Sequence, residues 1–229
     1  MFDWTADDLQ ILGLSLKVAL VATCASVPLA AAVALLLARG RFVGRGLLNA
    51  VIHLPLVLPP VVTGYVLLRL LGRRGPIGAW LDDTFGLVFA FRWTGAAVAA
   101  AVMGFPLMVR AIRLSIESVD ARLEEAASTL GAAPGWTLLT VTLPLALPGI
   151  LSGMVLGFAK ALGEFGATIT FVSNIPGETQ TLALAIYTLT QSPGGDVRVV
   201  RLAVLSIVVS LVALLIAETL SRRAAARRS

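Results

Sequence analysis

The sequence has very few of the side chains that carry out chemistry. It contains one cysteine, Cys24, and one histidine, His53, and both fall inside apolar stretches. A single cysteine excludes a disulfide within the chain, and these two residues form neither a metal cluster nor a nucleophile–base pair. We therefore expect no catalytic residues, no metal and no cofactor in this chain. His53 is read as a packed, hydrogen-bonded side chain rather than a ligand.

Charge is also scarce. Only 14% of the 229 residues are charged, 58% are hydrophobic, and the mean hydropathy is +0.92. A soluble domain cannot bury that much apolar surface, so we predict an all-α integral membrane protein. The acidic N-terminus lacks the basic start of a cleavable signal peptide, so we expect the first apolar segment to be retained. The net charge of +5 comes largely from arginines that flank apolar segments, which indicates membrane topology rather than nucleic-acid binding.

Five apolar segments come close to the roughly 20 residues that cross hydrocarbon. They are residues 12–38, 47–71, 94–112, 147–172 and 202–220. Arginines cluster after the first, third and fifth of them, so the positive-inside rule predicts an external N-terminus and a cytoplasmic C-terminus with a basic tail over residues 221–229. The main exceptions, left outside, are Arg73, Arg74, Arg92, Arg198 and Arg201.

The second apolar segment is interrupted by Pro55, Pro59 and Pro60 and continues with Thr63. Each proline removes a backbone donor, so the freed carbonyl groups must face protein, water or a cavity. Broken helices of this kind often line a translocation path. A structural kink packed by neighbouring helices is the alternative.

The fourth segment carries three glycines at four-residue spacing, which favour close packing against another helix. Lys160 and Glu164 follow, also four residues apart, and can pair on one helix face. Such a pair either neutralises itself and holds the bundle together or faces a water-filled cavity and contacts a substrate. It is also the one polar pair at depth that an intramembrane enzyme would have available.

Glycines and hydroxyl side chains are frequent in the stretch GEFGATITFVSNIPGETQTL, residues 163–182. Its hydroxyl and backbone N–H groups suit a small oxyanion. We include Thr168, Thr170 and Ser173 with the candidate path. Residues 181–191 have helical length but are too short to cross, and residues 72–93 are expected to form a glycine-rich external loop with interfacial tryptophans.

A polar insert, DARLEEAASTLGAAPGWTLLTVTLP, spans residues 120–144 between two apolar segments. Asp120 is a good N-cap, and Gly131 stands where a helix commonly ends. Leu123, Ala126, Ala127 and Leu130 share one helix face. We predict two short helices joined by a bend at Gly131, the second starting at Pro134 and ending before Pro144. A solvated linker is the alternative.

Part of this insert resembles the "EAA" loop of permease subunits of bacterial ABC importers. The matching residues are Glu125, Ala126, Ala127, Gly131, Leu143 and Pro144, with Val141 where the pattern prefers isoleucine. In that family the loop is the cytoplasmic coupling helix, which docks into a groove of the ATP-hydrolysing subunit. Together with HLPLVLPPVVTGY, GFPLMVRAIRLSIESVD and residues 163–182, the chain is similar over nearly its whole length to molybdate importer permeases.

The resemblance implies a type I ABC importer permease domain over residues 10–220 and a site in the inner membrane. Its partners would be a second copy of the chain, two ABC ATPase subunits, a periplasmic molybdate-binding protein and membrane lipid, with no nucleic acid. The chain has no glycine-rich GxxxxGK[ST] phosphate loop, so ATP hydrolysis is expected in the partner. Sulfate, thiosulfate or tungstate import remains an alternative, as do a passive channel and a purely structural membrane anchor.

Overall fold

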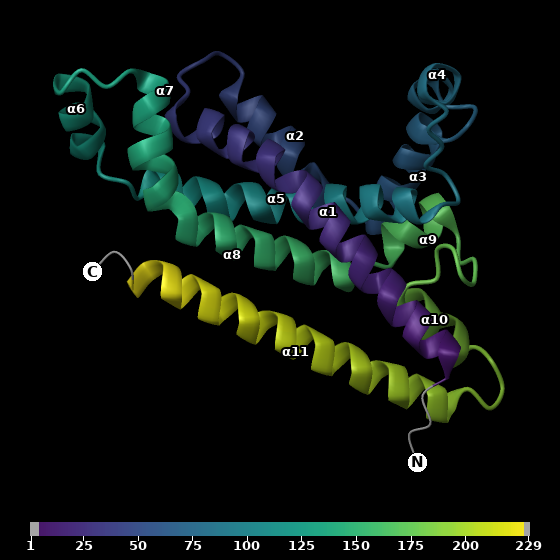
Figure 1. The fold of residues 1–229 in the computed structure, drawn as a ribbon. Helices are drawn as coiled ribbons and strands as arrows, with labels where there is room; N and C mark the ends of the chain where they lie inside the picture. The colour runs from purple at the N-terminus through teal and green to yellow at the C-terminus, as the bar shows by residue number, and fades with distance from the viewer. Residues whose placement is uncertain (1–4, 227–229) are drawn as a thin grey trace.

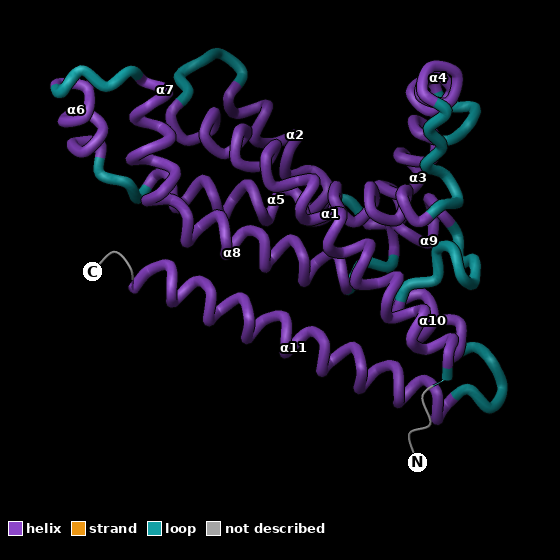
Figure 2. The backbone as a smooth tube through the Cα atoms, viewed as in Figure 1, coloured by secondary structure: helices purple, strands orange, loops and turns teal. Residues whose placement is uncertain are grey.

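The computed structural model of this chain describes residues 5–226 and is almost entirely helical (Figures 1 and 2). Its four long elements are α1 (Ala6–Arg39), α5 (Trp93–Glu117), α8 (Leu143–Leu162) and α11 (Asp196–Ala226). The shorter helices are α2 (Arg45–Val57), α3 (Pro60–Leu71), α4 (Pro76–Phe85), α6 (Ala121–Thr129), α7 (Pro134–Thr137), η1 (Leu138–Thr142), α9 (Gly166–Val172) and α10 (Leu182–Thr190). Of the expected basic tail, residues 221–226 continue α11, and residues 227–229 lie outside the described residues.

The number of membrane-spanning segments agrees with the sequence. Within residues 5–226, four helices are long and apolar enough to cross a membrane, and the pair α2 and α3 makes a fifth if it counts as one broken span. The four are Ala6–Arg39, Trp93–Glu117, the combined helix Pro134–Leu162, and Asp196–Ile216. The predicted all-α membrane fold with about five spans is confirmed.

The second span is broken at its prolines, as expected. α2 and α3 meet at an angle of 113°. Leu58 and Pro59 both have extended backbone conformations, because a residue that precedes a proline is sterically disfavoured in the helical region. Pro60 then begins α3, where its missing N–H needs no partner. Pro55 lies within α2 and does not end it.

Small residues let the central helices approach closely. α1 and α5 bury alanines against each other and against α8, and α5 is the most buried of the spans. The predicted glycine stripe on α8 faces α5: a Cβ at Gly149 would lie 2.0 Å from Ser115 Cβ, and one at Gly157 would lie 2.5 Å from Met108 Sδ. A methyl group at Gly149 would overlap Ser115, and one at Gly157 would force the Met108 side chain to shift, so the stripe has the predicted packing role.

The fourth span differs from its prediction at both ends. Pro144 does not end a short helix, because α7, η1 and α8 run on as one helix from Pro134 to Leu162. In η1 the N–H of Leu143 bonds to the carbonyl of Leu138, and this wider π-type turn accommodates the proline that follows it. At the other end the span stops at Leu162 instead of continuing to Val172.

The chain turns at Gly163 and Glu164 and begins the separate helix α9. Lys160 Nζ donates to Glu164 Oε2 at 2.5 Å, and the N–H of Ala167 donates to Glu164 Oε1 at 3.0 Å. Glu164 therefore caps the start of α9 while it pairs with α8, and its side chain is 2% exposed. The expected ion pair is formed, and its contacts join two helices.

A buried charge cluster joins α1 to α11 at the end of the bundle where α1 begins. Asp8, which is fully buried, accepts from Arg198 Nε at 2.9 Å and pairs with Arg201 at 2.5 Å. Thr5 and Asp8 also form a reciprocal capping box at the start of α1. We call this region the Asp8 end. Its ion pairs compensate the positive charges of Arg198 and Arg201, two of the arginines that the predicted topology places on the external side.

The connecting segments contain more helix than the sequence suggested. Residues 72–93, expected to be a loop, include the ten-residue helix α4, which begins at Pro76. α10 has the expected short length, and the N–H of its first residue, Leu182, donates to Ser15 Oγ at 2.7 Å. α10 therefore packs against α1 and α11 and is too short to cross the membrane.

Helices α3 and α9 form the tightest contact of the broken span. A Cβ at Gly64 would lie 2.4 Å from the carbonyl oxygen of Ala167 and 2.9 Å from Thr170 Cβ. A Cβ at Gly166 would lie 2.7 Å from Pro60 Cβ. The broken span is thus supported by the stretch that leaves α8, although the two are about a hundred residues apart in the sequence.

This contact predicts a stability difference between two glycine substitutions. Gly64→Ala should destabilise the protein by about 1–3 kcal/mol, because the added methyl group overpacks the backbone of α9. Gly13→Ala is the control, since no heavy atom lies within 4 Å of its would-be Cβ and alanine favours the helix. Thermal unfolding in detergent measures both, and equal midpoints for the two variants would contradict the packing described here.

Candidate functional site

The polar insert folds as the sequence predicted around Gly131. Asp120 caps α6, accepting from the N–H of Arg122 at 2.9 Å. At the other end Gly131 has φ +86°, a left-handed conformation that favours glycine, and the N–H of Ala132 donates to the carbonyl of Ala127 at 3.0 Å. The turn then leads into α7 at Pro134. α6 therefore projects from the bundle as a separate short helix (Figure 1).

One face of α6 is apolar and uncovered. Leu130 is 88% exposed, and Leu123 and Ala126 on the same face are also exposed. Trp136 on α7 and Leu139 in η1 add further exposed apolar surface. Among the described residues α6 buries none of its own. We call this end of the bundle the α6 end, and its uncovered apolar side chains can bind a partner protein.

A hydrogen-bond network through Glu124 ties α6 to the bundle. Glu124 Oε1 accepts from Arg39 at 3.0 Å and from Thr142 Oγ1 at 2.7 Å. Arg39, the last residue of α1, also donates to the carbonyls of Ile116 and Val119 at 3.3 Å each. α1, α5, α6 and η1 therefore meet at one point. Glu124 is not among the residues predicted from the sequence, because nothing in the sequence marks a partner 85 residues away.

The EAA-like residues divide into exposed and anchoring positions. Glu125 and Ala126 are exposed on α6, and Ala127 is partly covered. Leu143 and Pro144 lie beyond η1 at the start of α8. Glu124 bonds to Thr142, the residue before Leu143, and so connects the two parts of the pattern.

Besides the prolines at the break and the Lys160–Glu164 pair described above, the other five candidate path residues fall into three places. Thr63 on α3 lies on the tightly packed α3–α9 pair, as do Thr168 and Thr170 on α9. The Thr63 hydroxyl is buried and has no hydrogen-bond partner among the described residues. Pro55 stays apart on α2. Ser173 follows α9 with φ +63°, in a loop that Thr179 holds by bonding to the carbonyl of Ser173 and the N–H of Ile175.

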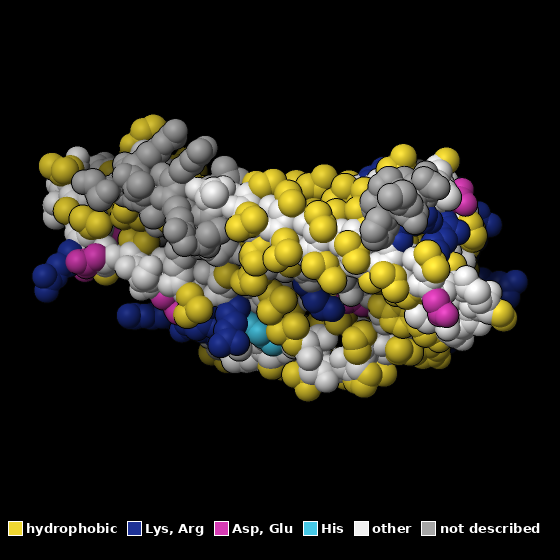
Figure 3. All heavy atoms as spheres, turned by 90° about the horizontal axis from the view of Figure 1, so that it is seen from below, with side chains coloured by type: hydrophobic (Ala, Val, Ile, Leu, Met, Phe, Trp, Pro, Cys, Tyr) yellow, Lys and Arg dark blue, Asp and Glu magenta, His cyan; other side chains and the backbone are white. Residues whose placement is uncertain are grey.

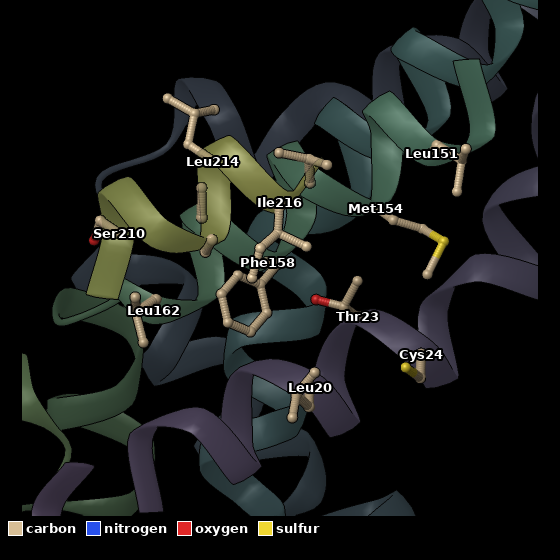
Figure 4. Close-up of a pocket in the computed structure, with 13 residues that line it drawn as sticks. Leu20, Thr23, Cys24, Leu151, Met154, Phe158, Leu162, Ser210, Leu214 and Ile216 are labelled. Atoms are coloured by element: carbon tan, nitrogen blue, oxygen red, sulfur yellow. The ribbon is translucent and has the colours of Figure 1, made fainter. Parts of the chain in front are cut away.

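Three cavities differ in the chemistry of their walls. The first, of about 190 Å³, lies between α1, α8 and α11 and is lined almost entirely by apolar side chains such as Phe158 and Leu20 (Figure 4). The second, at the Asp8 end, includes Gln10, Gln180 and Arg198. The third, between α2 and α5, is basic and contains His53 and Arg110. Within residues 5–226 no group of three His, Cys, Asp or Glu side chains is placed to hold a metal ion.

Comparison with known proteins identifies the class. Residues 26–226 match the model of the family described as binding-protein-dependent transport system inner membrane components. The chain belongs to this family of importer permeases. Among solved structures, a bacterial ABC transporter for import of the acidic polysaccharide alginate shares the fold, with a TM-score of 0.76 at 19% identity over 96% of this chain and 80% of that one.

Individual relatives belong to a narrower group of permeases within this family. The chain is 58% identical to the molybdenum transport system permease protein ModB of Escherichia coli, over 95% of both chains. It is 56% identical to the ModB protein of Haemophilus influenzae, over 94% of both. The sulfate transport system permease protein CysT of Escherichia coli is 39% identical over 66% of this chain and 54% of its own length.

The Glu124 network predicts a local effect on α6. Glu124→Ala removes the acceptor for Arg39 and Thr142, so α6 and the following turn should become less protected by roughly 1–2 kcal/mol, since both side chains are partly solvent-exposed. Glu125→Ala, one residue away, removes no contact within the bundle. Hydrogen exchange over residues 120–142 measures the difference, and equal protection in both variants would show that Glu124 does not anchor α6.

Proposed function

We propose that this chain is the permease subunit of an ATP-driven molybdate importer. The observation that carries the proposal is 56–58% identity to two molybdenum transport permeases over about 95% of the chain. Sulfate import is less supported, because the sulfate permease matches less closely and over a shorter region. Molybdate, tungstate and sulfate are all tetrahedral dianions, so the permease fold suits each of them.

Two copies would form the path. α2 buries none of its described residues, and the outward faces of α2 and α3 expose large apolar side chains. These exposed apolar side chains include Val51, Leu54, Val57, Val61, Tyr65 and Val66. A second copy packed against these faces would cover them and place two broken spans around a common axis. The α3–α9 pair, with Thr63, Thr168 and Thr170, would then lie beside the path.

The α6 end would face the cytoplasm and bind a separate ATPase subunit through the apolar face of α6. The arginine bias supports this orientation, since Arg39, Arg45, Arg113 and Arg122 gather at this end. A periplasmic binding protein would then deliver the oxyanion at the Asp8 end. ATP-driven closure of the ATPases would move α6 as a rigid body. Glu124 would transmit that motion to α1 and α8 through Arg39 and Thr142.

In this mechanism the chain forms the path and holds its helices in place, and it carries out no chemical reaction. Lys160 and Glu164 satisfy each other where α8 passes into α9, so they stabilise the corner beside the path and do not leave a free charge for the ion. Hydroxyl and backbone groups near α3 and α9 would contact the dianion as the corner moves. Selection among oxyanions would rest largely with the binding protein.

Uptake into vesicles tests the proposal. Vesicles holding this chain, its ATPase and the binding protein should accumulate radiolabelled molybdate only with ATP, and an excess of sulfate should leave most of the uptake intact. Uptake abolished by sulfate would favour a sulfate permease. Flux without ATP would rule out an importer and favour a passive channel.

A surface variant tests the docking face separately. Leu130→Asp should weaken binding of the ATPase subunit about tenfold or more, because a charge would be buried in an apolar interface. It should not affect folding, since Leu130 is almost fully exposed in the chain alone. Val197→Asp, an equally apolar exposed residue on α11 at the Asp8 end, is the control. Normal recovery of the ATPase with Leu130→Asp would exclude this face.

A further inference from the structure

A basic pocket lies between α2 and α5, toward the α6 end of the bundle. Its volume is about 320 Å³, and it is lined by Asn49, His53, Arg110, Arg113, Leu114 and Glu117. In the view from below, the histidine lies beside a group of basic side chains, with apolar side chains next to it (Figure 3). Such a pocket next to membrane-spanning helices requires an explanation, because charge there is costly.

The two helices present their polar residues to the pocket at regular spacing. Asn49 and His53 are four residues apart on α2, and Arg110, Arg113 and Glu117 recur on one face of α5. Arg113 joins the helices. Its Nε donates to Glu117 Oε1 at 2.8 Å, and its Nη1 donates to Asn49 Oδ1 at 3.2 Å. The wall of the pocket is therefore held in place by internal contacts.

Two groups remain available to a ligand. Glu117 is already bound by Arg113 and lies 3.9 Å from Arg45, so its negative charge is compensated. Arg110 has no hydrogen-bond or ion-pair partner among the described residues and is exposed. His53 uses Nδ1 to donate to the carbonyl of Asn49 at 2.8 Å, which leaves Nε2 free. The region has a net positive charge, because three arginines, Arg45, Arg110 and Arg113, face one carboxylate, Glu117.

We propose that this pocket is a transient binding site for the transported tetrahedral oxyanion, with Arg110 as its charged donor. The proposal rests on the molybdate import proposed above and adds a site on α2 and α5 that the candidate path did not include. A guanidinium group suits the oxygens of a tetrahedral dianion, because it presents several N–H donors in one plane. His53 and Asn49 would line the opposite wall.

The other cavities fit an oxyanion less well. The pocket between α1, α8 and α11 has almost no polar wall, and the cavity at the Asp8 end has its arginine, Arg198, bound to Asp8. The basic pocket also lies on α2, the first half of the broken span, next to the apolar faces that a second copy would cover. Because Arg110 is exposed and is the one free guanidinium lining this pocket among the described residues, binding should be weak enough to permit release.

Direct binding tests the site. The purified permease–ATPase complex, without binding protein or nucleotide, is equilibrated with radiolabelled molybdate. Arg110→Gln should weaken binding roughly tenfold, as expected for loss of a charged hydrogen-bond donor. Arg110→Lys keeps the charge but loses the planar set of N–H donors, so it should recover only part of the affinity lost in Arg110→Gln. Arg41→Gln is the matched control, because Arg41 is an exposed arginine near the same end with no partner among the described residues and is not part of the pocket.

The outcomes separate this inference from the proposed function. Equal affinity of Arg110→Gln and Arg41→Gln, or no saturable binding by the unmodified complex, would overturn the site while ATP-dependent molybdate uptake still supported the importer. A phosphate headgroup shares the chemistry of the ligand, so uptake is also compared in zwitterionic vesicles and in vesicles with anionic lipid. An Arg110→Gln defect confined to anionic vesicles would assign the pocket to lipid and overturn the proposal.

Discussion

Close approach of backbones through small side chains is the constraint on which this fold depends. Lipid tails are as apolar as leucine, so apolar burial does not hold helices together in a membrane as it does in water. The structure instead brings α8 onto α5 at Gly149 and Gly157 and packs alanines of α1 against α5. α3 is held to α9 in the same way at Gly64 and Gly166. Each of these contacts depends on the absence of a larger side chain.

Polar contacts then fix the ends of the bundle that the small residues assemble. Asp8 joins α1 to α11 at one end, and Glu124 joins α1, α6 and η1 at the other. Glu164 fixes the corner between α8 and α9 beside the broken span. In each case a carboxylate accepts from two different groups, and in each case the contact joins separate helical elements. The Glu124 contacts connect α6 directly to α1 and η1.

The surfaces left uncovered indicate what the single chain lacks. α6 exposes Leu123 and Leu130 at one end, α2 and α3 expose apolar side chains along one side, and α11 exposes apolar side chains along most of its length. Membrane lipid accounts for the last of these. In the function proposed above, a second copy of the chain would cover α2 and α3 and an ATPase subunit would cover α6, and the two copies of the chain would enclose the path.

Much of this was determined by the sequence alone. Apolar length gave the spans, the prolines at 59 and 60 placed the break between α2 and α3, and the spacing around Gly131 gave α6, because each depends on local backbone chemistry. The helical run through Pro144 and the stop at Leu162 were mispredicted, since a π-type turn and a capping carboxylate decided them. The tertiary structure alone brought Asp8 to Arg198 and Glu124 to Arg39, and placed His53 and Arg110 in the lining of one pocket. The members of each pair are tens to nearly two hundred positions apart, and nothing local in the sequence specifies which helix faces will meet.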